Sequence, residues 1–247
     1  MKTESINKKQ GIITNLKFLL EAMGRKVIET NKSKKREYDF VWKHLHACNS
    51  ILDVGCGVGL LFNYAPDRIT GIDINPNNVR FCNSNGYNAI VGDALNIKFN
   101  DNAFDGVHSS HVMHIFNSEQ AMVFIKELCR VCKPGGIIVV TAKHDSKHFW
   151  IDPENSRPYP PSVFYSYSVP QASKEKPRLN PMWEKMPQFE PIDINYRRPP
   201  LYYFMMYGSR NLLRISMALN IIQCKIGLKK YWTFDAYTIV LVNQKTS

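Results

Sequence analysis

The chain has 247 residues, of which 44% are hydrophobic and 21% charged, and its formal net charge is +11. This length is enough for one large hydrophobic core but not for two full-sized domains, and the composition excludes a wholly disordered chain. The positive charge indicates attraction to an anionic partner, which could be nucleic acid, a membrane surface or a phosphorylated substrate.

Residues 1–37 are rich in lysine and contain short apolar segments, which predicts a basic amphipathic helix followed by a linker over 31–36. This N-terminal segment is either a cap over a ligand cleft or a helix that packs on the domain with a solvated face. The main domain is expected to run from residue 38 to residue 247.

Between residues 38 and 143, short apolar runs alternate with stretches of helical periodicity. Strands that alternate with helices predict a parallel sheet covered on both faces, and right-handed crossovers restrict the topology to a doubly wound α/β fold. The expected strands are 50–54, 69–72, 88–91, 104–109 and 137–142, and the expected helices are about 38–47, 58–64, 76–84 and 118–131.

The last hundred residues divide into two parts. Residues 144–200 are rich in proline and aromatic residues without a clear period, so we expect a lid or substrate-binding insertion over the carboxyl edge of the sheet. A helix is expected over 201–224 and a final strand over 236–242. The basic and aromatic segment 197–230 predicts a membrane-surface helix, an RNA contact, or a helix packed on the core with its charges in water.

The six cysteines follow no disulfide-framework spacing, and the N-terminus lacks the apolar core of a secretory signal. We therefore expect a cytoplasmic, reduced protein. Cys129 and Cys132 end a helical pattern without a second pair at zinc-binding spacing, so they are expected to be buried thiols and no metal is expected. No run of 18 apolar residues occurs, so no transmembrane segment is expected.

A glycine-rich turn follows the first expected strand, where Gly55, Gly57 and Gly59 form G-x-G-x-G two residues after Asp53. Glycine permits a sharp turn and a close approach of a ligand to the backbone, at the strand end where open α/β sheets bind ligands. The dinucleotide fingerprint G-x-G-x-x-G is the alternative, but its third glycine would fall at Leu60.

Acidic residues end the next two expected strands. A carboxylate at Asp73 can accept hydrogen bonds from both hydroxyls of a ribose, which an NAD site would also require. Asp93 ends the third strand in Gly-Asp-Ala and can accept from an adenine amino group. An NAD site does not predict this third acid.

Five segments resemble the successive motifs of class I S-adenosylmethionine-dependent methyltransferases of the type 11 kind: 51–59 (ILDVGCGVG), 71–74 (GIDI), 92–94 (GDA), 101–105 (DNAFD) and 130–136 (RVCKPGG). The resemblance implies a seven-stranded sheet with an antiparallel last strand and S-adenosyl-L-methionine as the cofactor. It places the methionine part at Asp53, Gly55, Cys56, Gly57 and Gly59, the ribose at Asp73, the adenine at Asp93 and Ala94, and adds Ile74 and Ser109 to the cofactor-binding set.

Methyl transfer requires mainly positioning, and a base only if the nucleophile must lose a proton. The segment 109–115 (SSHVMHI) resembles Ser-Ser-His-Val-Leu-Glu-His of relatives, with His114 at the glutamate position and Ile115 at the last histidine position. This departure leaves His111 and His114 as candidate catalytic residues. Either histidine could instead stack beside the cofactor or pack against a helix.

Residues 149–160 (FWIDPENSRPYP) resemble a segment of methyltransferases of glycan and lipopolysaccharide assembly, with Asn155 in place of a histidine. The resemblance implies a saccharide or glycolipid acceptor, bound by Asp152, Arg157 and Tyr159 as a hydrogen-bonding wall. The structural alternative is an ion pair that holds the lid in place.

The sequence therefore predicts methyl transfer from S-adenosylmethionine to a small-molecule, glycan or lipid-linked acceptor, with oxygen as the preferred atom. An RNA methyltransferase is a less favoured alternative, because neither an appended RNA-binding module nor an Asn/Asp-Pro-Pro-Tyr motif occurs. A cofactor-binding protein without enzymatic activity is a third alternative. Peripheral contact with the anionic inner surface of a membrane is left open, and no oligomeric state is predicted.

Overall fold

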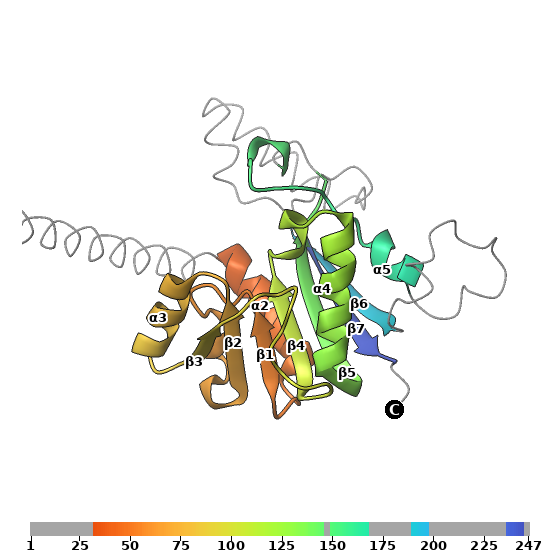
Figure 1. Ribbon diagram of the computed structural model, residues 1–247. Coiled ribbons are helices and arrows are strands. Elements are labelled where there is room, and N and C mark those ends of the chain that lie inside the picture. Colours follow the sequence, from red (N-terminus) through yellow and green to blue (C-terminus); the bar gives the residue numbers. More distant parts are fainter. Residues whose placement is uncertain (1–31, 146–148, 168–188, 198–235, 245–247) are drawn as a thin grey trace, which may run out of the picture.

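The computed structural model describes residues 32–145, 149–167, 189–197 and 236–244. Its centre is a seven-stranded sheet of order β3-β2-β1-β4-β5-β7-β6 (Figure 1). The strands are β1 (Ile51–Val54), β2 (Ile69–Asp73), β3 (Asn88–Val91), β4 (Phe104–Ser110), β5 (Cys132–Lys143), β6 (Phe189–Arg197) and β7 (Ala236–Asn243).

The first five strands are parallel, and β7 is antiparallel to both of its neighbours, β5 and β6. The doubly wound α/β fold with an antiparallel last strand is therefore confirmed. The chain leaves β1 toward β2 on one side and returns to β4 on the other, so the strand order reverses at β1. Ligands of open α/β sheets bind outside the carboxyl ends of the strands at such a reversal.

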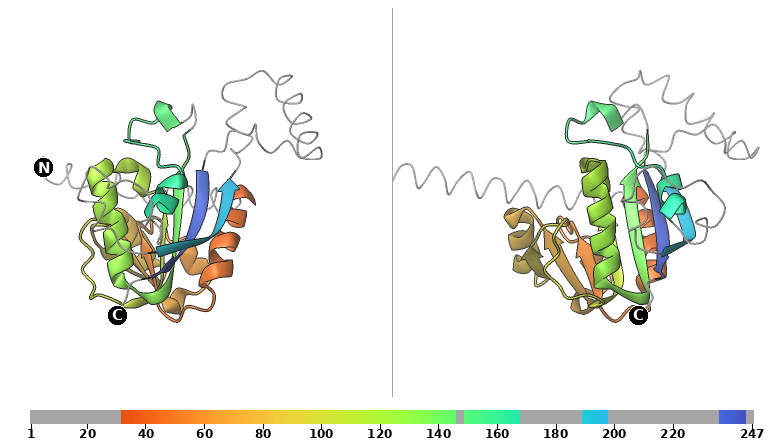
Figure 2. Two further views of the ribbon diagram at one scale, coloured as in Figure 1. Left: turned by 90° about the vertical axis from the view of Figure 1, so that its right-hand side faces the viewer. Right: turned by 45° about the vertical axis from the view of Figure 1, so that its right-hand side comes forward.

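Helices cover both faces of the sheet, with α4 on one side and α2 on the other (Figure 2). The α-helices are α2 (Lys32–Leu45), α3 (Pro76–Ser84), α4 (Ser118–Val131) and α5 (Ser162–Tyr167), and the 3₁₀ helices are η1 (Leu61–Asn63), η2 (Pro66–Arg68), η3 (Met113–Ile115) and η4 (Phe149–Ile151). None of the helices in the described part of the chain is long and apolar enough to cross a membrane.

The helix boundaries follow from local sequence. Asn117 caps α4 by accepting from the backbone N–H of Gln120, whose side chain accepts from the Asn117 N–H in return. Asn75 caps α3, and Pro76 at its first position lacks only an N–H that would have no partner within the helix. These signals explain why both helices match their predicted ranges.

The N-terminal boundary differs from the prediction. Helix α2 spans Lys32–Leu45, so residues 32–36 are helical where a linker over 31–36 was expected. The expected domain boundary between residues 37 and 38 falls inside this helix. The amphipathic helix expected nearer the N-terminus lies outside the described residues, as does most of the basic segment 197–230.

The predicted helix over 58–64 is wrong, because only the short 3₁₀ helix η1 occurs there. Pro66 follows closely, and a proline disfavours the helical conformation of the residue before it. Ala65 accordingly has φ −159° and ψ 74°. The chain between Gly59 and Pro66 is thus too short for a regular helix.

The stretch 144–200, which was expected to form an irregular lid, also contains the edge strand β6. Its pairing with β7 shifts between Pro191 and Asp193. Proline cannot donate to a β-ladder and is tolerated at sheet edges and bulges. The proline hides the strand periodicity, which explains why the sequence did not reveal this strand.

Candidate functional site

A loop of left-handed glycines follows β1 at the strand-order reversal. Gly55, Gly57 and Gly59 have φ values of +73°, +53° and +75°, which L side chains rarely adopt. A Cβ atom added at Gly55 would lie 2.3 Å from Cγ2 of Val112, whereas one added at Gly57 would meet nothing within 4 Å. The loop therefore packs under the segment after β4 and leaves open space at Gly57.

The carboxylate of Asp73, at the end of β2, holds this loop. Its Oδ2 accepts from the Gly57 N–H at 2.8 Å, and its Oδ1 accepts from the Asn75 N–H at 2.8 Å and from Asn78 Nδ2 at 3.1 Å. The following residue, Ile74, has an apolar side chain that is 73% exposed. A buried acid and an accessible apolar side chain thus flank the open space.

Asp93 lies in the turn after β3, and the preceding residue, Gly92, contacts the backbone of Asp73. The Gly92 N–H donates to the Asp73 carbonyl at 3.1 Å, and the Asp93 carboxylate accepts from the Leu95 N–H at 2.8 Å. Ala94 packs against the core cluster that includes α4. Asp73 and Asp93 therefore lie at the carboxyl ends of neighbouring strands, whereas Asp53 lies within β1.

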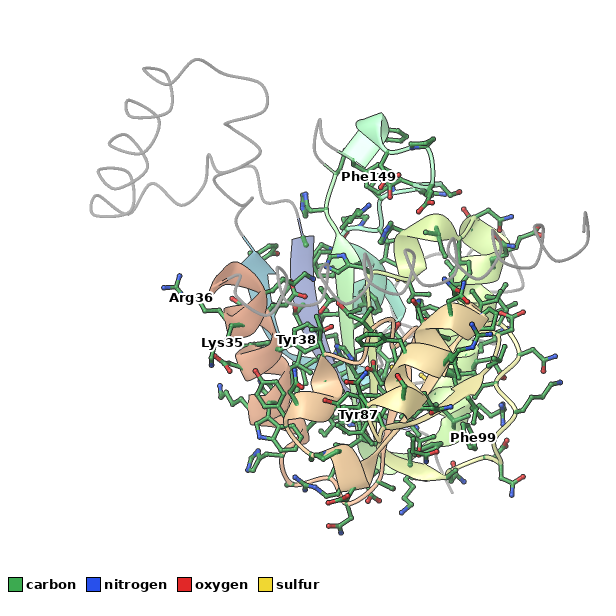
Figure 3. The ribbon with its side chains drawn as sticks, turned by 90° about the vertical axis from the view of Figure 1, so that its left-hand side faces the viewer. Lys35, Arg36, Tyr38, Tyr87, Phe99 and Phe149 are labelled. Carbon is green, nitrogen blue, oxygen red and sulfur yellow. The ribbon has the colours of Figure 1, made fainter. Side chains whose placement is uncertain are left out.

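A buried polar layer lies between α2 and the sheet, beneath the loop. Asp53 Oδ1 lies 2.7 Å from His108 Nδ1, and both side chains are almost fully buried. The Tyr38 ring lies 5.8 Å from the His108 ring, and Tyr38 extends from α2 toward the strands (Figure 3). Burial, together with the charges of Asp53 and Glu37, raises the pKa of Tyr38 well above its ordinary value.

A second polar layer lies one step closer to the carboxyl edge. Glu37 is 3% exposed, and its Oε1 lies 2.8 Å from Lys34 Nζ, 3.4 Å from Ser110 Oγ and 3.7 Å from His111 Nε2. His111 has a left-handed backbone with φ +59°, and its N–H donates to the Thr141 carbonyl at 2.8 Å. The turn after β4 thus holds His111 beside a buried carboxylate.

His114 occupies a different environment. It is 3% exposed, and its carbonyl accepts from the N–H groups of Ser156 and Arg157. Burial lowers the pKa of His114 to about 3, and the charges of Lys143 and His111 add to this effect. Its imidazole is therefore neutral and only weakly basic at neutral pH.

Comparison with known proteins agrees with this geometry. Residues 52–140, which run from β1 through β5, match the family model described as a methyltransferase domain. This segment of the chain, from β1 to β5, is thus similar to methyltransferase domains. A solved structure of an S-adenosylmethionine-dependent methyltransferase from Archaeoglobus fulgidus superimposes with a TM-score of 0.59 at 18% identity, covering 85% of this chain and 92% of that one, and so shares the fold.

Curated relatives match this chain over part of its length. A fatty-acid O-methyltransferase of Mycolicibacterium smegmatis is 36% identical over 37% of this chain and 36% of its own length. A tRNA (carboxymethyluridine(34)-5-O)-methyltransferase of Arabidopsis thaliana is 34% identical over 37% of this chain and 23% of its own length. The chain thus spans about a third or less of these relatives.

The open space at Gly57 beside Asp73 fits S-adenosylmethionine, the cofactor that the methyltransferase motifs imply. Three predicted cofactor-binding side chains have partners inside the protein instead. Asp53 contacts His108, and Ser109 Oγ donates to the Val54 carbonyl at 2.8 Å. The Cys56 thiol contacts Cys82, and this contact, with burial as the next largest cause, raises its pKa. We therefore expect the loop to bind ligand through its backbone rather than through these side chains.

The predicted acceptor-binding residues also have partners. Asp152 Oδ2 accepts from Lys143 Nζ at 2.8 Å, which lowers the pKa of Asp152. Arg157 Nη1 donates to Ser118 Oγ at 2.5 Å, and the buried Tyr159 donates its hydroxyl to the Phe116 carbonyl at 3.0 Å. These contacts favour the structural alternative for this segment, most clearly for Tyr159. Phe149, at its start, lies beyond the strand ends (Figure 3).

Sequence reasoning missed Glu37, Tyr38, His108 and Ser110. The signal was the run of polar residues at the end of β4 (His108, Ser109 and Ser110). A strand buried on both faces is ordinarily a continuous apolar run, so polar residues there are unusual. Cys129 and Cys132 are buried thiols, as expected. No cluster of His, Cys, Asp or Glu that could hold a metal ion occurs in the described part of the chain.

Proposed function

We propose that the protein transfers a methyl group from S-adenosylmethionine to an oxygen atom of a small-molecule, glycan or lipid-linked acceptor. The observation that carries this proposal is the open space at Gly57, bounded by Asp73 and lying beside the turn that holds His111. One edge of the sheet thus offers a place for the cofactor and, next to it, a basic side chain.

The residues that would hold the cofactor follow three neighbouring strands. The backbone of the glycine loop, most of whose N–H groups already donate within the protein, would pack against its methionine part. The Asp73 carboxylate would face its ribose, and Asp93 its adenine amino group. The exposed Ile74 side chain would cover the adenine ring. When bound, the cofactor would supply an activated methyl group.

The chain's own contribution to the chemistry is a base for the acceptor hydroxyl. Of the two predicted histidines, His114 is a poor base because its pKa is lowered to about 3. His111 is partly exposed and has a carboxylate nearby. We therefore assign proton acceptance to His111.

The relatives support oxygen as the methylated atom, since both the fatty-acid enzyme and the tRNA enzyme are named O-methyltransferases. The tRNA relative and the net charge of +11 also keep RNA as a second candidate acceptor. An acceptor screen with fatty acids, lipid-linked glycans and unmodified tRNA would separate these classes. Methylation of tRNA alone would overturn the small-molecule proposal.

Cofactor binding is tested first, by calorimetric titration with S-adenosylhomocysteine, with NAD as a control ligand. Gly57→Ala is compared with Gly86→Ala, because both positions have positive φ and space for a Cβ, but Gly86 lies at the end of α3, outside the site. We expect Gly57→Ala to lose about tenfold or more in affinity, equivalent to about 1.4 kcal/mol, and Gly86→Ala to lose nothing. Equal affinities, or a folded wild-type protein that does not bind, would refute the proposed site.

A further inference from the structure

The strongest unassigned feature is a buried carboxylate that helix α2 brings to the site from outside the matched methyltransferase domain. Glu37 precedes residue 52, where the family match begins, yet it is 3% exposed and lies between α2 and the end of β4. Its neighbour on the same helix, Asp39, is exposed and pairs with Lys35. The two acids of one helix thus have opposite environments.

We propose that Glu37 is a positioning residue for His111, which it orients and stabilises in its protonated form during methyl transfer. The proposal rests on the proposed function, because His111 requires such a partner only if it accepts a proton. A carboxylate beside the imidazole favours its protonated, charged form over the neutral one.

The distance between Glu37 Oε1 and His111 Nε2 supports a role in the charged state. At 3.7 Å it is too long for a hydrogen bond to a neutral imidazole but within the range of an ion pair. The attraction is therefore weak before proton transfer and strong after it. Interactions that strengthen only as charge develops are those that accelerate a reaction.

The backbone of His111 adds an independent observation. A left-handed conformation is costly for a residue with a Cβ, and such strain persists where the surroundings hold it. Here the His111 N–H bonds the Thr141 carbonyl, and the next residue, Val112, packs over Gly55. The turn therefore directs His111 to the space between α2 and the glycine loop.

Several other charged or titratable groups surround this pair. Lys34 approaches Glu37 from the preceding helical turn at 2.8 Å, and the rings of His114 and His111 are 5.9 Å apart. Lys143 on β5 acts on His114, and Tyr38, Asp53 and His108 lie in the deeper polar layer. Lys34 competes with His111 for the same carboxylate oxygen, so its removal should strengthen the Glu37–His111 interaction.

The test is a titration of the histidine side chains by nitrogen-15 NMR in the full-length protein with S-adenosylhomocysteine present, with the His111 signal assigned by its loss in His111→Gln. We expect the His111 titration midpoint to move to lower pH in Glu37→Gln and to higher pH in Lys34→Met. The matched control, Asp39→Asn, changes an exposed acid on the same helix and should leave the midpoint unchanged.

An unchanged midpoint in Glu37→Gln, with cofactor affinity retained, would overturn the inference while leaving the proposed function intact. Loss of S-adenosylhomocysteine binding in the wild-type protein would instead refute the proposed function. If Glu37→Gln does not fold, Lys34→Met still tests the inference. An unchanged or lowered His111 titration midpoint in Lys34→Met would contradict it.

Discussion

The two faces of the sheet bury different chemistry. On the face covered by α4, inward side chains of the strands are largely apolar and form one cluster with Phe124, Ile125 and Leu128 of the helix. On the face covered by α2, the side chains are apolar near the amino ends of the parallel strands and polar near their carboxyl ends. The buried groups are Asp53, His108, Thr141 and Thr238, with Glu37 from the helix, and the partly buried Ser110 and Tyr38 lie beside them.

This difference separates a largely apolar face from one that carries polar groups next to the candidate site. Burying a polar group is unfavourable unless it is hydrogen-bonded, and here the groups pair with one another, as in the 2.9 Å contact between Thr141 Oγ1 and Thr238 Oγ1. The polar layers lie under the glycine loop and beside His111. We infer that the α4 face mainly stabilises the fold, whereas the α2 face also organises the site.

The largest expected effect concerns the apolar face. Phe124 is fully buried, so Phe124→Ala should lower the free energy of unfolding by about 3–5 kcal/mol, because lost burial and a cavity both act. Urea unfolding measures this loss. Val123→Ala, at the neighbouring and 40% exposed position, should change stability by only about 0.5 kcal/mol. A folded Phe124→Ala protein that no longer bound S-adenosylhomocysteine would contradict the division between the faces.

An intermediate effect is expected in the buried polar layer. Asp53→Val removes the partner of His108 and should cost about 2–3 kcal/mol, because a buried polar group then lacks its hydrogen bond. The double variant Asp53→Val/His108→Leu replaces both groups by apolar ones and should recover much of that loss. Unfolding measurements of the double-mutant cycle test this coupling, and strictly additive losses would show that the pair does not interact.

The smallest effect is a pH dependence. The pKa of His114 falls from 6.5 to about 3 on folding, so the unfolded chain binds the proton more tightly than the folded one. The stability that His114 contributes as a neutral side chain is therefore present above pH 6.5 and is lost as the pH falls below it. The free energy of unfolding should decrease by about 1.4 kcal/mol between about pH 7.5 and pH 5.5 on this account. His114→Gln should remove this component, whereas His46→Gln, at an exposed histidine, should retain it. Identical pH profiles for wild type and His114→Gln would refute it.

Much of the fold, and the placement of several candidate site residues, could be predicted from local sequence. Strands β1 to β4 and helices α3 and α4 depend on short apolar runs, capping residues and glycines, which act within a few positions along the chain. Gly57 and Asp73 could be predicted for the same reason, since each follows a strand and parallel strands bring their ends to one edge.

Tertiary structure alone decided which side chains meet across the sheet. Glu37 and His111 are far apart in sequence and approach only because α2 packs on the face to which His108 and Ser110 point. Burial, which no local pattern specifies, distinguishes His114 from His111 as a base. The sequence thus determined the fold and the class of cofactor, because those depend on local backbone geometry, whereas the proton chemistry depends on long-range packing, which only the folded chain creates.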